Sequence, residues 1–184
     1  FFVFFVSMIP APHTSPLLPA TTRSRSSLPA GRIVRAVSFG EGQAIDSVRD
    51  MQVIVGLSTA CPDSTRRVAA DLAGRGASYL DAGISGGAAA AEKGTLTLMV
   101  GGAADALDDV RDVLGHFATK IAHCGGSGAG HTVKLLNNFL NAIALSATAE
   151  VMVAAKKADL DLETVLEVLN ASSGVNFATI NRFP

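Results

Sequence analysis

The sequence predicts an α/β layer with a largely parallel sheet, followed by an all-helical part. Between residues 52 and 124, short apolar runs alternate with amphipathic segments of helical period, a pattern typical of strands connected by helices. After Gly130 the alternation stops, and residues 131–160 are nearly all apolar, which predicts one long helix. The chain has 184 residues and is 48% hydrophobic, so it can bury a core.

Four strands and two helices make up the predicted α/β layer. We expect strands at 52–58, 77–82, 94–102 and 119–124, and helices at 61–76 and 103–118. Pro62 or Asp63 opens the first helix, and Gly74 or Gly76 closes it. Its apolar stripe consists of Val68, Ala69 and Leu72. A similar apolar stripe runs along the second helix and predicts that one side of it covers the sheet.

The helical part is predicted to contain two helices. Residues 161–174 form the second one, with Asp161 near its start and Gly174 past its end. Residues 136–155 of the long helix are apolar but contain three asparagines and a glutamate, which favours a buried helix over a membrane span. The N-terminal FFVFFV is far shorter than the ~20 residues that a span needs.

Composition argues against several classes of function. The charge is nearly balanced, with 15 Lys+Arg against 16 Asp+Glu, which gives no reason to expect a nucleic acid or an anionic membrane as partner. Tryptophan is absent and aromatic residues are few, so a base-stacking surface is not predicted either. Cys61 and Cys124 are far apart and indicate neither a disulfide framework nor a zinc site.

Residues 1–34 differ from the rest of the chain. They are rich in Pro, Ser, Thr and Arg and contain no acidic residue, a composition typical of disorder. A transit peptide has the same composition, and sequence that does not belong to the protein is a third explanation. The chain does not begin with Met and ends soon after a helical segment, so we expect a fragment at both ends.

A glycine-rich stretch, GGSGAGHTVKLLNN, leads into the long helix and invites comparison with phosphate-binding loops. A dinucleotide-binding loop needs G-x-G-x-x-G, but His131 occupies the third glycine position. A P-loop needs glycine directly before its lysine, but Val133 precedes Lys134. The stretch therefore fits a flexible joint between two domains better than a phosphate cradle.

Lys134, Asn138 and Asn141 form a polar stripe on the long helix, since their spacing places them on one face. If the stripe is buried, desolvation lowers the pKa of the lysine and allows proton exchange near neutrality. If the lysine instead extends to solvent, the stripe is merely exposed. The pattern alone does not decide between these interpretations.

Two loops follow predicted strands and are candidates for ligand binding. In DAGISGG, the backbone N–H groups of Ser85, Gly86 and Gly87 could bind an anion, although an ordinary tight turn explains the same residues. In LSTACP, the hydroxyls of Ser58 and Thr59 either cap the next helix or contact a ligand. Ligands in open α/β sheets bind beyond the carboxyl ends of strands, where both loops fall.

These segments, in this order, resemble the β-hydroxyacid dehydrogenases, the 3-hydroxyisobutyrate dehydrogenase family. LSTACP is similar to the family's S-T-x-x-P, DAGISGG…EKGTLTLMVGG to D-A-P-V-S-G-G…G-T-L-x-x-M-V-G-G, and GAGHTVKLLNN to its G-x-G-x-x-x-K-x-x-x-N helix. The likeness runs from about residue 35 to 184. It implies the C-terminal part of a Rossmann-like parallel sheet followed by an all-α domain that starts with a long helix.

The resemblance also implies roles for individual residues. Lys134 matches the catalytic lysine, which exchanges a proton with the substrate hydroxyl, and Asn138 matches the asparagine that helps to hold that hydroxyl. The family's loop that binds the substrate carboxylate matches Ser85, Gly86 and Gly87. Thr59 matches a threonine that contacts the cofactor, NAD or NADP.

The expected organisation is a disordered or unrelated segment (1–34), a partial NAD(P)-binding Rossmann-like domain (35–125) and the start of the helical dehydrogenase domain (126–184). Gly83 stands where the family usually has proline, and the family's G-x-G-x-x-G loop is missing. The implied partners are a small hydroxyacid or semialdehyde and, at full length, further copies of the same chain, without nucleic acid, membrane or metal. The implied location is the cytoplasm, or the mitochondrion if 1–34 is a transit peptide. The alternative is an inactive truncated homologue that serves at most as an oligomerisation or interaction module.

Overall fold

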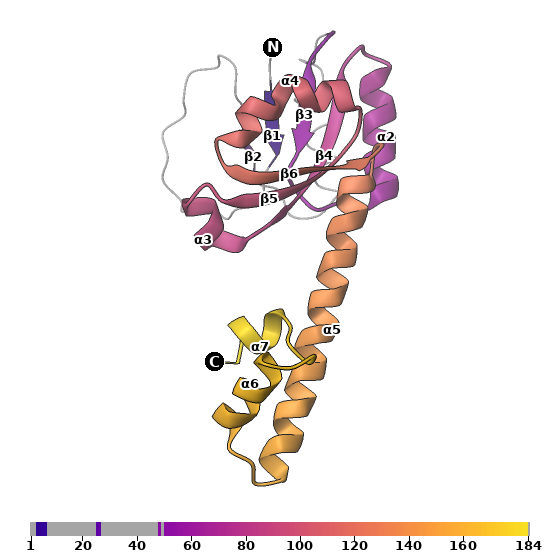
Figure 1. Ribbon diagram of the computed structural model, residues 1–184. Helices are drawn as coiled ribbons and strands as arrows, with labels where there is room; N and C mark the ends of the chain where they lie inside the picture. The colour runs from indigo at the N-terminus through magenta and orange to yellow at the C-terminus, as the bar shows by residue number, and fades with distance from the viewer. Residues whose placement is uncertain (1–2, 7–24, 27–47, 49, 184) are drawn as a thin grey trace. The chain divides into compact units, whose positions relative to one another are not determined.

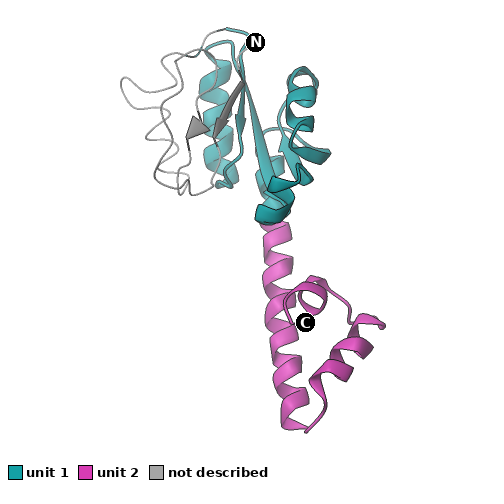
Figure 2. Ribbon diagram, turned by 90° about the vertical axis from the view of Figure 1, so that its left-hand side faces the viewer, with its two compact units in different colours: residues 1–134 teal, residues 135–184 magenta. Residues whose placement is uncertain are grey.

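The computed structural model describes residues 3–6, 25–26, 48 and 50–183. It divides into two compact units, Phe1–Lys134 and Leu135–Pro184 (Figure 2). The first unit is an α/β layer and the second is all-helical, as the sequence predicts. The boundary falls inside helix α5 (Ala129–Lys157), directly after Lys134.

A six-stranded sheet forms the centre of the first unit (Figure 1). Its strands lie in the order β2-β1-β3-β4-β5-β6. Their bounds are Val3–Val6 (β1), Arg25–Ser26 (β2), Val53–Gly56 (β3), Ser78–Ser85 (β4), Leu96–Gly101 (β5) and Ala118–Gly125 (β6). Every neighbouring pair is parallel except β4 and β5.

The antiparallel pairing of β4 with β5 is one departure from the parallel sheet that the sequence predicts. Between these strands the chain has only ten residues, 86–95, which include the short helix α3 (Gly87–Glu92). A parallel crossover needs a dozen residues or more, so a connection of this length favours the antiparallel direction. The sheet is therefore mixed.

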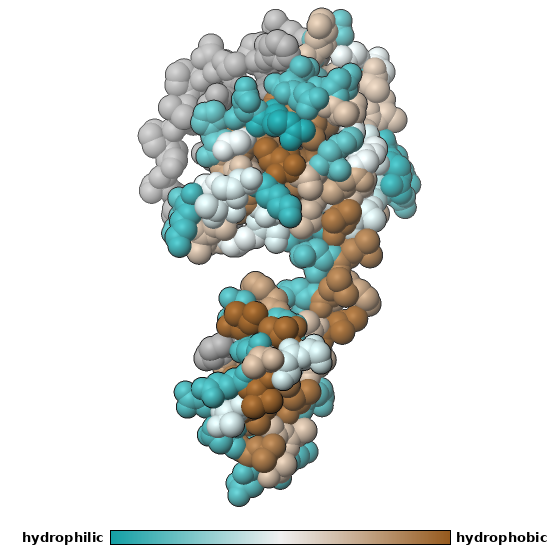
Figure 3. Space-filling model, viewed as in Figure 1, coloured by the Kyte–Doolittle hydropathy of each residue, from teal (hydrophilic) through white to brown (hydrophobic). Residues whose placement is uncertain are grey.

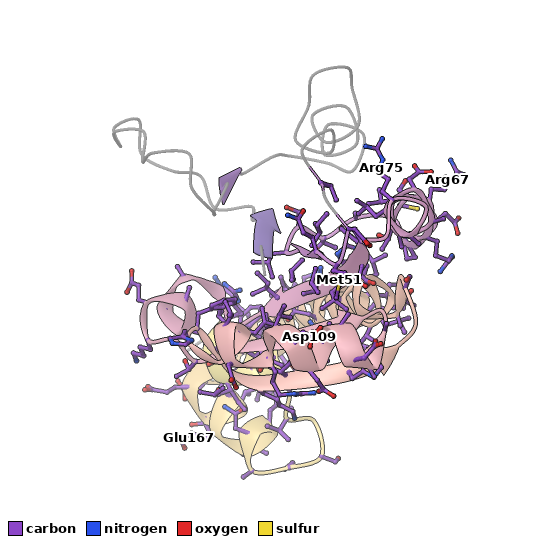
Figure 4. All side chains as sticks on the ribbon, turned by 90° about the horizontal axis from the view of Figure 1, so that it is seen from above. Met51, Arg67, Arg75, Asp109 and Glu167 are labelled. Carbon is purple, nitrogen blue, oxygen red and sulfur yellow. The ribbon has the colours of Figure 1, made fainter. Side chains whose placement is uncertain are left out.

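Two longer helices cover the two faces of the sheet: α2 (Pro62–Ala73) and α4 (Ala104–Gly115). The larger core lies under α4, whose fully buried Leu107 and Leu114 pack against alternate residues of β3, β4 and β5. A smaller core joins α2 to Ile54 and Ala77. The polar faces of these helices point away from the sheet, as the labelled Arg67 and Asp109 show (Figure 4).

β4 is longer than the sequence predicts, because the glycine-rich segment was expected to leave the strand after Ala82. Instead, Gly83 and Ser85 continue the ladder and pair with Met99 and Thr97 of β5. Gly83 is buried, and a Cβ at this position would lie 2.5 Å from the Cβ of Lys134. A glycine fits inside this strand because another element approaches it closely.

The second unit contains most of α5 (Ala129–Lys157) together with α6 (Leu162–Asn170) and α7 (Phe177–Asn181). α5 ends in a Schellman turn: Asp159 adopts φ 57°, and the N–H of Leu160 donates to the carbonyl of Ala155. Asp161 caps α6 by accepting from the N–H of Thr164. The Schellman turn ends α5 at Lys157, three residues before the predicted end of the helix at residue 160.

The expectation that the long helix is buried is wrong for the residues that the structure describes. Large apolar side chains of α5 are exposed, among them Phe139, Leu140 and Ile143, at 62%, 68% and 50%. Figure 3 shows hydrophobic side chains over the visible side of α5. By length and composition alone α5 could also cross a membrane, so the absence of membrane contact stays a prediction.

The segment expected to be disordered or unrelated, 1–34, lies mostly outside the described residues. The described parts, Val3–Val6 and Arg25–Ser26, are strands, and β1 pairs with β3 along its whole length. The edge of β3 that faces away from β4 is therefore paired.

Candidate functional site

The polar residues of the site share one face of β4. Side chains alternate along a strand, so Tyr79, Asp81, Gly83 and Ser85 point to the side opposite Leu80 and its neighbours in the main core. The carboxyl ends of β3 and β4 meet at the same edge of the sheet, because these strands are parallel. The site is built where β4 reaches this edge.

Asp81 holds the beginning of α5. The Asp81 carboxylate is fully buried. Its Oδ1 accepts from the backbone N–H of Gly128 and its Oδ2 from that of His131, each at 2.7 Å. These donors belong to the N-cap and third positions of the helix, where backbone N–H groups have no partner within the helix. A buried charge here is stabilised by two N–H donors and by the positive end of the helix dipole.

Glycines allow α5 to begin directly on the sheet. A Cβ at Gly130 would overlap the carbonyl oxygen of Met99 and would lie 2.5 Å from that of Asp81. A Cβ at Gly101 would lie 2.7 Å from the amide nitrogen of Gly130. The three nearest neighbours of a Cβ at Gly130 are all main-chain atoms, so close packing, rather than the flexibility of a joint, explains why Gly130 is glycine.

His131 and Thr65 connect the same turn of α5 to α2. Both side chains are buried, and His131 Nδ1 is hydrogen-bonded to Thr65 Oγ1 at 2.8 Å. Nδ1 also lies 4.0 Å from Asp81 Oδ2. Burial lowers the pKa of His131, and Asp81 opposes this shift, so the imidazole is neutral at neutral pH.

Lys134 lies one turn further along α5, with the stem of its side chain against Gly83. The side chain is half-buried, and desolvation lowers the pKa of its amine. Ser85 is two residues beyond Gly83 on the same face of β4, so it lies on the side of the strand that Lys134 covers. The structure thus brings the predicted lysine and serine to one face of β4.

Gly86 and Gly87 follow Ser85 directly and turn the chain from β4 into α3. Gly86 has φ 129°, a conformation that side chains disfavour, and a Cβ there would lie 2.6 Å from the Cβ of Ala90. Both glycines are exposed at the end of the strand. The predicted anion-binding loop is therefore a strand end followed by a glycine turn.

The remaining predicted site residues lie on other elements. Thr59 is half-buried in the loop that joins β3 to α2, at the carboxyl edge of the sheet. Asn138 is exposed on α5, one helical turn after Lys134 but in the second unit. His116 and His123 are each hydrogen-bonded through the ring to a backbone carbonyl, of Asp112 and Gly102 respectively. Within the described part of the chain, no group of three or more His, Cys, Asp or Glu side chains could hold a metal.

Asp81, His131 and Thr65 were not predicted as site residues. Asp81 carried a detectable signal, since a single carboxylate ends an otherwise apolar strand and needs a partner when buried. Thr65 carried none, because its position is ordinary for a helix that covers a sheet.

Two family models match almost all of the chain outside its N-terminal residues. The NAD binding domain of 6-phosphogluconate dehydrogenase matches residues 19–126. The NAD-binding domain of NADP-dependent 3-hydroxyisobutyrate dehydrogenase matches residues 128–184. The junction between the two matches coincides with the glycine-rich turn before α5.

Proteins that are similar to this chain include several named dehydrogenases. The chain is 38% identical to 2-(hydroxymethyl)glutarate dehydrogenase of Eubacterium barkeri and 37% identical to 3-hydroxyisobutyrate dehydrogenase of Pseudomonas aeruginosa, in each case over 83% of the chain and 51% of the relative. Among solved structures, 3-hydroxyisobutyrate dehydrogenase of Mycobacterium tuberculosis with L-serine superposes with a TM-score of 0.78 at 33% identity, over 85% of this chain and 53% of that one. The chain spans about half the length of these relatives.

Proposed function

Because the chain belongs to the β-hydroxyacid dehydrogenase family, we propose that it transfers hydride between a nicotinamide cofactor and a small β-hydroxyacid or semialdehyde. The observation that carries the proposal is the position of Lys134. Its amine has a lowered pKa, and its side chain lies across β4 on the face that ends in Ser85. A site for alcohol oxidation needs a proton acceptor beside an anchor for the substrate.

Lys134 is the proposed acid–base residue. Oxidation of an alcohol moves a hydride from carbon to the cofactor and a proton from the hydroxyl oxygen to a base, which leaves a carbonyl group. The neutral amine of Lys134 accepts that proton, and the ammonium returns it in the reverse reaction. Asn138, one turn along α5, is proposed to bind the same oxygen with its amide.

Ser85, Gly86 and Gly87 are proposed to bind the substrate carboxylate. The serine offers a hydroxyl and the two exposed glycines offer backbone N–H groups, which suit a carboxylate oxygen. With the carboxylate at the end of β4, the hydroxyl of a short acid extends back over Gly83, toward Lys134. This arrangement orients the substrate for proton transfer.

The proposed substrates share a chemical core. The names of the two relatives contain 3-hydroxyisobutyrate and 2-(hydroxymethyl)glutarate, and the solved structure is a complex with L-serine. All three compounds carry a hydroxymethyl group and a carboxylate on one carbon, and they differ only in the third substituent. We therefore propose this class of acid, with the third substituent as the variable group.

NAD or NADP would supply the hydride acceptor. The described residues fit one edge of such a site: Thr59 presents a half-exposed hydroxyl in the loop after β3, at the carboxyl edge where α/β sheets bind nucleotides. The sequence contains no G-x-G-x-x-G. Family membership also supports, as further proposals, a homo-oligomer at full length and a cytoplasmic location, or a mitochondrial one if 1–34 is a transit peptide.

Rates should depend on pH in opposite directions for the two reactions. Oxidation needs the neutral amine of Lys134, so kcat should fall as the pH drops through the pKa of this residue, which burial places below its ordinary value of 10.5. Reduction needs the ammonium form, so kcat should fall as the pH rises through the same pKa. Profiles of kcat in both directions check this, and two profiles with the same slope would contradict it.

The function is tested with a panel of acids that vary in the third substituent. The protein expressed from its own gene is mixed with NAD or NADP and each acid, and formation of the reduced cofactor is followed by absorbance. We expect turnover of at least one acid and none of its methyl ester, because the ester lacks the charge that the strand end binds. No turnover of any acid with either cofactor would favour the alternative, a non-catalytic homologue.

A further inference from the structure

We propose that Asp81, His131 and Thr65 are positioning residues: they hold the first turn of α5, and with it Lys134, against the strand ends that bind cofactor and substrate. This inference rests on the proposed function of Lys134. It concerns three buried side chains that are proposed to act through Lys134 rather than on the substrate itself.

The network joins one turn of α5 to two other elements, β4 and α2. Asp81 of β4 accepts the N–H groups of Gly128 and His131, each at 2.7 Å. The imidazole of His131 then bonds Thr65 of α2 at 2.8 Å. A shift of this turn would break both the cap and the imidazole bond, so its position is fixed from two sides.

The same imidazole also lies near the end of β3, at the proposed cofactor edge. It faces the backbone carbonyls of Gly56 and Ser58, at the end of β3 and directly before Thr59. Its Nε2 is buried and has no partner within hydrogen-bond geometry among the described residues. Because His131 precedes Lys134 by three residues, the imidazole and the lysine side chain lie on the same face of α5, one helical turn apart.

Of the groups that the structure describes, four charged or titratable ones lie near His131 or its helix turn. Arg66 of α2 lies close to Gly128, and Cys124 has a thiol whose pKa is raised by burial and, to a smaller extent, by Asp81. Asp81 faces His131 from β4, and Tyr79 lies beside Asp81 on the same strand, with a pKa that burial raises. The α2 contact, Thr65, is uncharged. Rearranging a fully buried polar network would leave some of its groups without hydrogen-bond partners, at a large cost in free energy. Such a network therefore favours a fixed position of the first turn of α5 over a mobile one.

Thr65→Val is the decisive variant, because it removes the hydroxyl and keeps the shape of the side chain. Thr65→Ser keeps the hydroxyl and serves as the rescue. Thr148→Val is the matched control: Thr148 is also a buried threonine, but its hydroxyl bonds Asn176 in the second unit, away from Lys134. If Thr65→Val does not fold, Thr65→Cys replaces it, since a thiol is a weak hydrogen-bonding group.

Two readouts separate positioning from stability. The pKa of Lys134 is measured by NMR titration of lysine labelled at the ε-carbon, and its signal among the five lysines is identified from its loss in Lys134→Arg. The second readout is kcat and KM of the protein expressed from its own gene. We expect Thr65→Val to raise the pKa of Lys134 toward its ordinary value and to lower kcat about tenfold or more, with KM within about threefold.

Thr65→Ser should have nearly the original pKa of Lys134 and nearly the original kcat. Thr148→Val should lower the melting temperature without changing the pKa of Lys134 or kcat. The proposal is overturned if Thr65→Val leaves the pKa of Lys134 and kcat at their original values, or if Thr148→Val changes them as much. A protein that transfers no hydride would refute the proposed function instead, and the lysine titration would still decide whether the network positions Lys134.

Discussion

Replacing Lys134 by alanine is expected to lower kcat about 10³-fold, the typical contribution of a positioned acid–base group. The fold should survive, since the cap from Asp81 and the close packing of Gly130 hold the start of α5 without this side chain. The measurement is the rate of cofactor reduction with the best acid of the panel, together with circular dichroism and a thermal melt.

Lys120→Ala is the control for Lys134→Ala, because Lys120 is an exposed lysine on β6. It removes the same charge and should leave kcat unchanged. A small primary amine added to Lys134→Ala should recover part of the lost rate, since it can occupy the space of the missing group and accept the proton. A folded Lys134→Ala protein with undiminished kcat would exclude the catalytic role.

Gly130→Ala is expected to have the largest effect on stability, with a loss of about 3 kcal/mol in the free energy of unfolding. The added methyl group would overlap the carbonyl oxygen of Met99 and lie 2.5 Å from that of Asp81. These oxygens belong to neighbouring strands, so neither can move without disturbing the sheet. Urea denaturation measures the change.

Gly115→Ala provides the contrast within the same protein. Gly115 is the last residue of α4, and nothing lies within 4 Å of the position that a Cβ would take. Alanine should stabilise this helix by about 0.5–1 kcal/mol relative to glycine. Equal effects of the two substitutions, or a Gly130→Ala protein as stable as the original, would show that α5 does not begin as close to the sheet as described.

Much of the fold could be predicted because its signals are local. The apolar runs that became β3 and β5 and the amphipathic period of α4 each determine an element within a few residues. The direction of β4 relative to β5 is not local in this sense, and only the short connection between them indicated it. The continuation of β4 through Gly83 depends on the approach of Lys134 from a distant part of the chain.

The site shows the same division between local and distant information. Motif spacing indicated Lys134 and Ser85, and the structure places both on one face of β4. Motif spacing did not indicate that Asp81 would cap the helix that carries the lysine, because 47 residues separate this carboxylate from Gly128. The bond between His131 and Thr65 spans 66 residues, so the sequence around either residue did not indicate it. Such partners are visible only when the sheet and helices are assembled.

The most direct test of hydride transfer to the cofactor, with Lys134 as the base that takes the hydroxyl proton, uses an acid with deuterium on its hydroxymethyl carbon. The reduced cofactor is isolated after incubation with the protein and analysed by mass spectrometry. The account predicts one deuterium in the reduced cofactor with the original protein and almost none, over the same time, with Lys134→Ala. Reduced cofactor without deuterium, or equal transfer by the two proteins, would contradict it.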